Sequence, residues 1–571
     1  MTNYSVITCI NISVDFITMT EDFKSKNMSA EDAAQLATVI RAQNLLRQDK
    51  DLEERINNDQ SIDDAVAAST KEFGTDGHSE QTQVRIAKRA ALLKEGINPY
   101  PDVLDITTTI EEVRQKYAGQ LEAGEETGDI VGIAGRVMFL RNTGGLCFVQ
   151  LQAGSGETLQ GMLSKRELGK ESLDKFKKFV DLGDQLFLKG KVIASKTGEL
   201  SVFASEWAIA SKALRPLPVL HDELGEDLRT RKPYLGMIVN DKMRKMVRTR
   251  AAVTASVRHN FERRGYLEAE TPILQTIHGG AAARPFSAHI NAFDMNLYLR
   301  IAPELFLKRL LVGGVDKVFE INRNFRNEGV DRTHAPEFTA LEAYEAYGSY
   351  NTMADLTKNL IQQAAIDVFG STEVTLADGT KYDLGGEWRS ITMYESLSEK
   401  VGEEITPDTS LEYLEKLATK FGLELDNVVN HGKLIEKLWD HFYTEDPHTL
   451  WEPTFVRDFP TDTSPLTKSH RSKKGVTEKW DLYVRGFELG TAYSELNDPV
   501  IQRERLVQQA KQVLQGDIED SMAIDEDFIE ALGQAMPPAG GMGMGMDRLL
   551  IALTGATIRE TITFPLVKPL R

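Results

Sequence analysis

The spacing of hydrophobic residues divides the start of the chain into an extension and a helix. Hydrophobic residues recur at helical intervals from Ala30 to Gln48, and a polar, acidic stretch with the composition of a loop or disordered segment follows. A basic amphipathic helix is predicted from Arg85 to Gly96, because a glycine followed closely by prolines marks a helix end. We expect residues 1–84 to form a partly helical or disordered N-terminal extension, which is either loosely docked or an added contact for a nucleic acid or another partner.

Short hydrophobic runs with β-strand alternation follow between Asp129 and Ala213. There are five such runs, and a helical run near Ser172 to Val180 separates the third from the fourth. This is the order of elements in an OB-fold barrel, although five short strands also occur in other small β domains. We predict a helix and an OB-fold domain over residues 85–218, followed by a linker of mixed charge over residues 219–233.

The remaining part of the chain, residues 234–571, mixes helical and strand patterns. Helical spacing from Asp241 to Gly265 leads into an extended run that ends at Pro272, and a strand-like run, PEFTALEAY, begins at Pro336. Further helical runs at residues 355–455 indicate an insertion. The pattern therefore predicts a second, larger domain of mixed α and β structure.

Composition narrows the class of protein. A chain of 571 residues is too long for one ordinary core, and 41% hydrophobic with 27% charged residues is a globular profile. There is no apolar run long enough for a transmembrane helix, and the N-terminal stretch carries Asp15 and no basic region, so we expect no membrane association and no signal peptide.

The only cysteines, Cys9 and Cys147, exclude a disulfide framework and a cysteine-based zinc site and fit a reducing cytoplasm. The net charge of −19 argues against a basic surface over the whole protein but leaves room for a local one.

The segment from Phe319 to Tyr347 carries the most specific candidate chemistry. Arg326 and Glu328 lie on a predicted strand, His334 lies in the loop that follows, and Phe338 lies on the return strand. An arginine there can meet the α-phosphate of ATP, and an aromatic ring can stack on adenine. Taken alone, an arginine and a glutamate on a strand are also typical of a cross-strand surface pair.

This segment resembles motif 2 of the class II aminoacyl-tRNA synthetases, and its flanking residues resemble the lysyl-tRNA synthetase family of bacterial type. The glycine-rich run Gly540 to Gly555 resembles motif 3, and the helix that leads to Pro272 resembles motif 1, which builds the dimer interface in that family. The resemblance spans Arg85 to Arg571. It implies an α+β fold, with an N-terminal five-stranded OB-fold barrel and an antiparallel class II catalytic sheet flanked by helices, in a homodimer.

The resemblance also implies an ATP site. Arg326 and Arg548 would neutralise the triphosphate and act as the catalytic residues, and Asp481 and Glu488 would hold Mg²⁺. Asp481 stands where the family commonly has glutamate, and Thr491 stands where it commonly has asparagine. The complete implied ATP-binding set is Arg326, Glu328, His334, Phe338, Glu488 and Arg548.

An acidic set of residues is implied for the amino acid. A buried lysine side chain needs anionic partners, because an unpaired ammonium is costly to bury. Tyr344 and Glu495 would receive the ε-ammonium, whereas Glu342 would serve the α-ammonium together with Glu304. An aspartyl or asparaginyl enzyme would instead need a cationic pocket. The complete implied lysine-binding set is Gly280, Glu304, Arg326, Glu342, Tyr344, Tyr493 and Glu495.

The barrel is implied to bind the tRNA anticodon. Phe148 resembles the aromatic residue that stacks on an anticodon base, and Gln160 resembles its neighbour that contacts a base edge. Arg136 and Arg141 would contact phosphates or bases. Phe148 as a residue of the barrel core, and the arginines as a solvated strand edge, are the alternatives.

The implied function is that of a cytoplasmic lysine–tRNA ligase. ATP would convert L-lysine to lysyl-adenylate, and the lysyl group would pass to the 3′ end of tRNA(Lys), without a covalent enzyme intermediate. Three alternatives remain: a ligase for aspartate or asparagine, a lysine-activating paralogue with a protein or lipid acceptor, and an inactive tRNA-binding regulatory protein.

Overall fold

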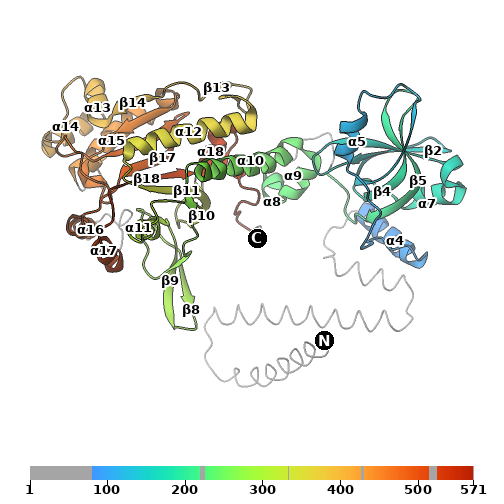
Figure 1. Ribbon diagram of the computed structural model, residues 1–571, viewed down its shortest axis with the longest axis horizontal. Helices are drawn as coiled ribbons and strands as arrows, with labels where there is room; N and C mark the ends of the chain where they lie inside the picture. Colours follow the sequence, from blue (N-terminus) through green and yellow to red (C-terminus); the bar gives the residue numbers. More distant parts are fainter. Residues whose placement is uncertain (1–79, 219–224, 332–333, 426–429, 514–523, 570–571) are drawn as a thin grey trace, which may run out of the picture. The chain divides into compact units, whose positions relative to one another are not determined.

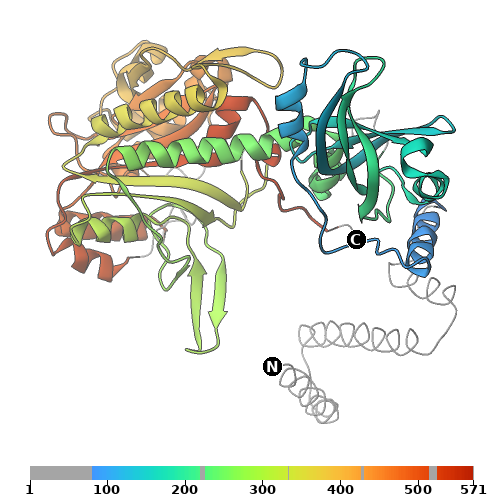
Figure 2. The same cartoon turned by 45° about the vertical axis from the view of Figure 1, so that its right-hand side comes forward.

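The computed structural model describes residues 80–218, 225–331, 334–425, 430–513 and 524–569 (Figures 1 and 2). The chain divides between Leu220 and His221 into two compact units. The helical run predicted from Ala30 to Gln48, and nearly all of the predicted N-terminal extension, lie outside the described residues.

The smaller unit is a closed five-stranded barrel, which confirms the predicted OB-fold. The strands pair in the order β1-β2-β3-β5-β4, and two helices separate the third strand from the fourth. Two further helices, α4 and α5, precede the barrel. The strands are β1 (Glu126–Asn142), β2 (Leu146–Gln152), β3 (Thr158–Ser164), β4 (Gln185–Ala194) and β5 (Leu200–Ser211), and the helices are α4 (Glu80–Lys94), α5 (Ile110–Tyr117), α6 (Lys165–Leu168) and α7 (Lys170–Phe179).

Alternation along β2 separates the core of the barrel from its outer surface. Val149 and Leu151 are fully buried in the barrel core, whereas Phe148 and Gln150 point to the other side. The amphipathic helix α7 adds Phe176 to the same core. The sequence pattern therefore leaves a polar and aromatic surface on the outside of β2.

The larger unit is built on an eight-stranded sheet with the order β14-β15-β16-β17-β18-β11-β10-β6, in which all pairs except β14-β15 and β10-β6 are antiparallel. Its strands are β6 (Leu267–Glu268), β10 (Lys317–Phe325), β11 (Glu337–Ala346), β14 (Arg389–Thr392), β15 (Thr454–Arg457), β16 (Lys479–Val484), β17 (Phe487–Ser494) and β18 (Ala539–Gly545). Smaller sheets contain β7 (Leu274–Gln275), β8 (Ser287–Ile290), β9 (Met295–Leu299), β12 (Glu373–Thr375) and β13 (Lys381–Asp383).

Helices cover this sheet and complete its core. α10 and α12 lie side by side (Figures 1 and 2), and Phe261 of α10 stacks on Phe319 of β10 with 4.5 Å between ring centroids. The helices of the larger unit are α8 (Glu226–Arg231), α9 (Pro233–Val239), α10 (Asp241–Arg263), α11 (Glu304–Val312), α12 (Tyr350–Phe369), α13 (Met393–Val401), α14 (Leu411–Lys420), α15 (His431–Tyr443), α16 (Pro499–Val513), α17 (Glu526–Leu532), α18 (Met546–Thr554) and α19 (Ile558–Thr561), with 3₁₀ turns at Pro447–Leu450 and Thr461–Thr463.

The structure differs from the sequence pattern at three places. The extended run before Pro272 is a strand only at Leu267–Glu268. Arg326 and Glu328 were predicted on a strand, but β10 ends at Phe325. Arg326 continues the ladder only through its N–H, which donates to the carbonyl of Pro336 at 2.9 Å. Within the segment 355–455, α12 packs on the main core, whereas α13, α14 and α15 form a separate cluster.

Candidate active site

A cavity of about 490 Å³ opens beside the central strands of the larger unit. Residues from β11, β16, β17, β18 and the loops before α11 and β11 line it. Every residue that the sequence singled out for ATP, lysine or metal lies in its wall, namely Gly280, Glu304, Arg326, Glu328, His334, Phe338, Glu342, Tyr344, Asp481, Glu488, Tyr493, Glu495 and Arg548. The fold thus brings together side chains that are more than 260 residues apart in the sequence.

Strand alternation and glycines shape one end of this cavity. Glu342 and Tyr344 alternate along β11 and face the same side, as predicted, and the Tyr344 hydroxyl donates to Oε2 of Glu342 at 3.2 Å. Gly541 of the adjacent β18 leaves room for them, because a Cβ atom there would collide with Oε1 of Glu495 and lie 2.5 Å from the Tyr344 ring. Gly280 has a φ of +84° and packs against Glu304, so a side chain at this position would be both strained and crowded.

Buried carboxylates dominate this end. Burial raises the pKa of Glu342 to about 8, and it raises the pKa of Glu495 to about 7 although Lys308 favours the ionised form. Nζ of Lys308 lies 2.6 Å from Oε1 of Glu304 and 2.5 Å from Oε2 of Glu495. This end of the cavity is therefore suited to a ligand that brings positive charge.

The motif 2 arginine lies between the acidic end and the open end. Its Nε atom is buried and has no hydrogen-bond partner in the described part of the chain, and its guanidinium carbon lies 5.2 Å from the centroid of the Phe338 ring. Burial lowers the pKa of Arg326, although Glu328, Glu342 and Glu488 favour its charged form. An arginine whose buried Nε atom lacks a partner is suited to an anionic ligand.

Arg548 occupies the open end, at the junction of β18 and α18. Its Nη1 donates to the carbonyl of Glu488 at 2.7 Å, and its Nη2 lies 3.5 Å from Nε2 of His334. The neighbouring Asp547 fixes this junction, because its Oδ2 accepts the N–H of Thr339 at 2.8 Å. Arg548 of the motif 3 segment thus lies against His334 of the motif 2 segment.

Asp481 and Glu488 are the candidate Mg²⁺ ligands in the cavity wall. Oδ1 of Asp481 is buried without a hydrogen-bond partner in the described residues, and its Oδ2 lies 3.1 Å from Nζ of Lys479. Burial and the nearby charge of Glu488 raise the pKa of Asp481, and the charge of Lys479 offsets only part of this rise. No group of three or more potential metal ligands occurs in the described ranges. Two carboxylates fit a Mg²⁺ ion that takes its other ligands from phosphates and water.

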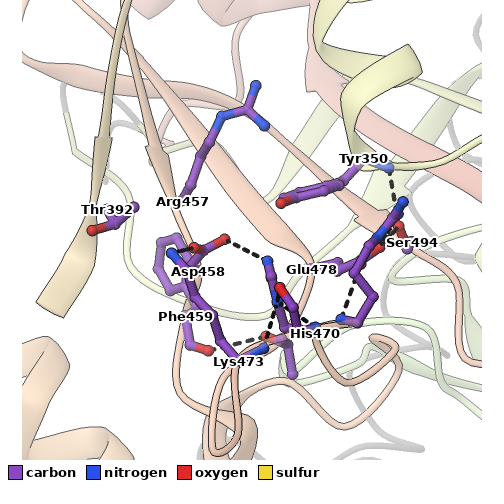
Figure 3. Close-up of polar contacts among 12 residues, drawn as sticks. Tyr350, Thr392, Arg457, Asp458, Phe459, His470, Lys473, Glu478 and Ser494 are labelled. Atoms are coloured by element: carbon purple, nitrogen blue, oxygen red, sulfur yellow. Dashed lines mark hydrogen bonds and ion pairs between the residues drawn. The ribbon is translucent and has the colours of Figure 1, made fainter. Parts of the chain in front are cut away.

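A polar cluster supports the strand end that carries Glu495 (Figure 3). Glu478 accepts hydrogen bonds from Ser494 Oγ at 2.5 Å and from Arg471 Nη2 at 2.8 Å, and Ser494 Oγ accepts the N–H of Tyr350 at 3.1 Å. Burial opposes ionisation of Glu478, but the hydrogen bonds from Arg471 and Ser494 lower its pKa to about 2. The residue before Glu495 is therefore held from two sides.

The four barrel residues predicted to contact an anticodon differ in their exposure and in their contacts within the barrel. Phe148 is half-buried and pairs across the strands with Arg141, which is exposed. Gln160 donates from Nε2 to Oγ of Ser201 at 2.9 Å. Arg136 instead donates from Nη1 to the carbonyl of Gly183 at 2.8 Å, so the barrel itself already holds its side chain.

Sequence reasoning missed three residues of interest. Lys308 is a buried partner of the cavity carboxylates and Lys479 is a half-buried one, and Phe139 is 52% exposed beside Arg141 on β1. A signal for Lys308 exists, since a lysine four residues after Glu304 falls on the same face of an otherwise largely apolar helix. A signal for Lys479 exists as well, since Lys479 and Asp481 are two residues apart on β16 and therefore share a face of the strand.

The fold and the cavity are those of a class II tRNA synthetase. Residues 225–568, more than half of the chain, match the family described as "tRNA synthetases class II (D, K and N)". Residues 131–210 match "OB-fold nucleic acid binding domain". None of the helices in the described ranges is long and apolar enough to cross a membrane.

Similar proteins narrow the class further. The chain is 57% identical to the lysine–tRNA ligase of Kineococcus radiotolerans over 491 residues, which are 86% of this chain and 97% of that protein. It is 58% identical to the lysine–tRNA ligase of Mycolicibacterium gilvum, with the same coverage of both chains. It is 44% identical to the lysylphosphatidylglycerol biosynthesis bifunctional protein LysX of Nocardia farcinica, over 86% of this chain and 43% of that protein. The chain belongs to the lysine–tRNA ligase family and is a ligase.

Proposed function

We propose that the cavity activates L-lysine with ATP and that the lysyl group then passes to the 3′ end of tRNA(Lys). The observation that carries this proposal is the meeting of three buried carboxylates, Glu304, Glu342 and Glu495, with the partly unpartnered Arg326 in one cavity. A substrate with two ammonium groups and one carboxylate matches this distribution of charge.

Each end of the amino acid has its own partners in this proposal. Glu495 and Tyr344 receive the ε-ammonium, and Glu304 and Glu342 receive the α-ammonium. Tyr493 forms the wall between these ends, and Gly280 lets the backbone approach the substrate closely. The carboxylate points toward Arg326.

ATP occupies the open end. Arg326 holds the α-phosphate beside the lysine carboxylate, Arg548 and His334 hold the outer phosphates, and adenine stacks on Phe338 while Glu328 faces its edge. A carboxylate oxygen of lysine attacks the α-phosphorus in line. The new oxygen–phosphorus bond forms as the bond to the bridging oxygen breaks, and pyrophosphate leaves. Positioning and charge neutralisation by Arg326 and Arg548 lower the barrier.

Asp481 and Glu488 are the residues that would hold Mg²⁺ in this proposal. The ion would neutralise phosphate charge when bound. Lys479 lies 3.1 Å from Asp481 and favours its ionised form, although burial raises the pKa of Asp481 overall.

The barrel recognises the anticodon in this proposal. Phe148 stacks on a base, Gln160 contacts a base edge, and Arg141 contacts the backbone. Arg136 contributes by holding the loop at Gly183, or by exchanging that carbonyl for a phosphate.

We also propose a homodimer that works in the cytoplasm. Exposed hydrophobic side chains occur on either side of Pro272: Leu267 of β6 is 62% exposed and Leu274 of β7 is 51% exposed. Phe293, in the turn between β8 and β9, is 74% exposed. Surfaces of this kind are typical of association sites.

The transfer step is tested by charging of tRNA. Purified protein with ATP, Mg²⁺ and labelled L-lysine should charge tRNA(Lys) and leave tRNA(Asp) and tRNA(Asn) uncharged. Lysine-dependent adenylate formation without charging of tRNA(Lys) would contradict the proposed acceptor and favour the paralogue with another acceptor.

A further inference from the structure

Lys308 is a charged side chain with no access to solvent. It lies on α11, its relative exposure is 0%, and it is not among the residues that line the cavity. Both of its carboxylate partners do line the cavity. The ammonium group therefore lies behind the cavity wall and acts on the ligand only through Glu304 and Glu495.

This ammonium group connects two elements that are distant in the sequence. Glu304 belongs to the same helix, four residues earlier, whereas Glu495 follows β17. Nζ lies 2.6 Å from the first carboxylate and 2.5 Å from the second. A buried ion pair of this geometry holds both carboxylates in place, because removal of one partner leaves a charge unpaired in the interior.

The ion pairs of Lys308 also change the number of charges that the cavity offers to the ligand. Glu304, Glu342 and Glu495 are the carboxylates at this end, and Lys308 neutralises one of them. When all three carboxyl groups are ionised, two carboxylate charges remain, which equals the number of ammonium groups in L-lysine. Glu304 and Glu495 serve opposite ends of the amino acid in the proposed function, so the residue that joins them determines how far apart the two ammonium sites lie.

We propose that Lys308 is a positioning residue that fixes the spacing of Glu304 and Glu495 and thereby selects L-lysine over shorter diamino acids. This inference rests on the proposed function, since it needs lysine as the substrate. L-ornithine, which lacks one methylene group, is the probe for spacing. Discrimination of one methylene group is typically about 10- to 200-fold, so a loss of spacing control is measurable.

The test compares Lys308→Met with Lys308→Arg. ATP–pyrophosphate exchange is measured with L-lysine and with L-ornithine, and the KM for ATP and the melting temperature are recorded for each variant. Lys317→Met is the matched control, because Lys317 pairs with Glu345 at 2.6 Å outside the cavity. Lys308→Met should lower kcat/KM for lysine by about 100-fold or more, the effect of breaking a buried pair. The preference for lysine over ornithine should shrink by at least about tenfold, with the KM for ATP and the control unchanged.

The variant Lys308→Arg distinguishes the effect of the positive charge from the effect of side-chain length on the spacing of the two carboxylates. It keeps the positive charge with a longer side chain, so kcat/KM for lysine should recover in part while the preference over ornithine stays reduced. An unchanged lysine-to-ornithine ratio in either folded variant would overturn the proposal and leave Lys308 a purely structural ion pair. If Lys308→Met does not fold, the ratio in Lys308→Arg decides alone. Absence of lysine-dependent exchange in the wild-type protein is a separate result, which would contradict the proposed function itself.

Discussion

The hydroxyl group of Tyr344 donates a hydrogen bond to Oε2 of Glu342 at 3.2 Å, two residues away on the same strand. This bond favours the ionised carboxylate, but burial outweighs it and raises the pKa of Glu342 to about 8. Glu495 lies at the same end of the cavity, with its pKa raised to about 7. Two of the proposed lysine ligands therefore bind protons in the physiological range.

The first prediction concerns pH. An ammonium ligand binds the ionised carboxylates, and both pKa values are raised, so binding is strongest above about pH 8 and weakens as the pH falls through 8 and then 7. The KM for lysine, measured by pyrophosphate exchange between about pH 6 and pH 9, should rise on acidification. In the variant Glu342→Gln, the KM for lysine should no longer change near pH 8, but it should still rise as the pH falls through 7. A KM for lysine that is constant over this range would count against the assignment of both carboxylates.

The second prediction concerns Arg326. Arg326→Ala should reduce lysine-dependent exchange by at least about 100-fold, because a preorganised donor to the reacting phosphate is lost. Arg326→Lys should recover only part of the rate, since a lysine cannot bind in the two-pronged manner of a guanidinium. Arg323→Ala is the control, as Arg323 lies nearby on β10 but is paired with Glu337 at 3.6 Å outside the cavity wall. Equal rates for Arg326→Ala and the control would remove Arg326 from the mechanism.

The third prediction concerns Gly541. A methyl group there would collide with Glu495 and Tyr344, so Gly541→Ala should raise the KM for lysine by about tenfold or more and leave the KM for ATP unchanged. Gly543 lies two residues further along the same strand, and a Cβ atom there would be 3.8 Å from Glu342 and 4.0 Å from Thr491. Gly543→Ala should therefore be mild. The steady-state constants of both variants test this difference, and an equal effect on lysine and ATP would show a general disturbance of the sheet instead.

The fourth prediction concerns the barrel. Phe148→Ala should leave adenylate formation intact and weaken charging of tRNA(Lys), because loss of one base–aromatic stack costs about 1–3 kcal/mol, or roughly 5- to 150-fold in the KM for tRNA. Ile130→Ala removes another exposed apolar side chain, 60% exposed on β1, and should change neither activity. Equal loss of exchange and charging in Phe148→Ala would contradict the anticodon assignment.

Local periodicity was sufficient to predict some features from the sequence and insufficient for others. Alternation placed Glu342 and Tyr344 on one face, and the order of five strands with an intervening helical segment predicted the barrel. The pairs of Lys308 with Glu304 and of Lys479 with Asp481 lie within one helix and one strand, so their spacing is visible in the sequence. The pair of Lys308 with Glu495 was not predicted, because it depends on an approach of distant elements that only the tertiary structure creates. For the same reason the bond from Arg136 to the carbonyl of Gly183 could not be read from the strand pattern.

In the proposed function the cavity activates lysine without the help of tRNA. ATP–pyrophosphate exchange with each of the standard amino acids in turn, with Mg²⁺ and without tRNA, measures this step directly. We predict exchange with L-lysine alone, since its two ammonium groups match Glu304, Glu342 and Glu495 beside Arg326. Exchange with aspartate or asparagine, or no exchange with any amino acid, would contradict it.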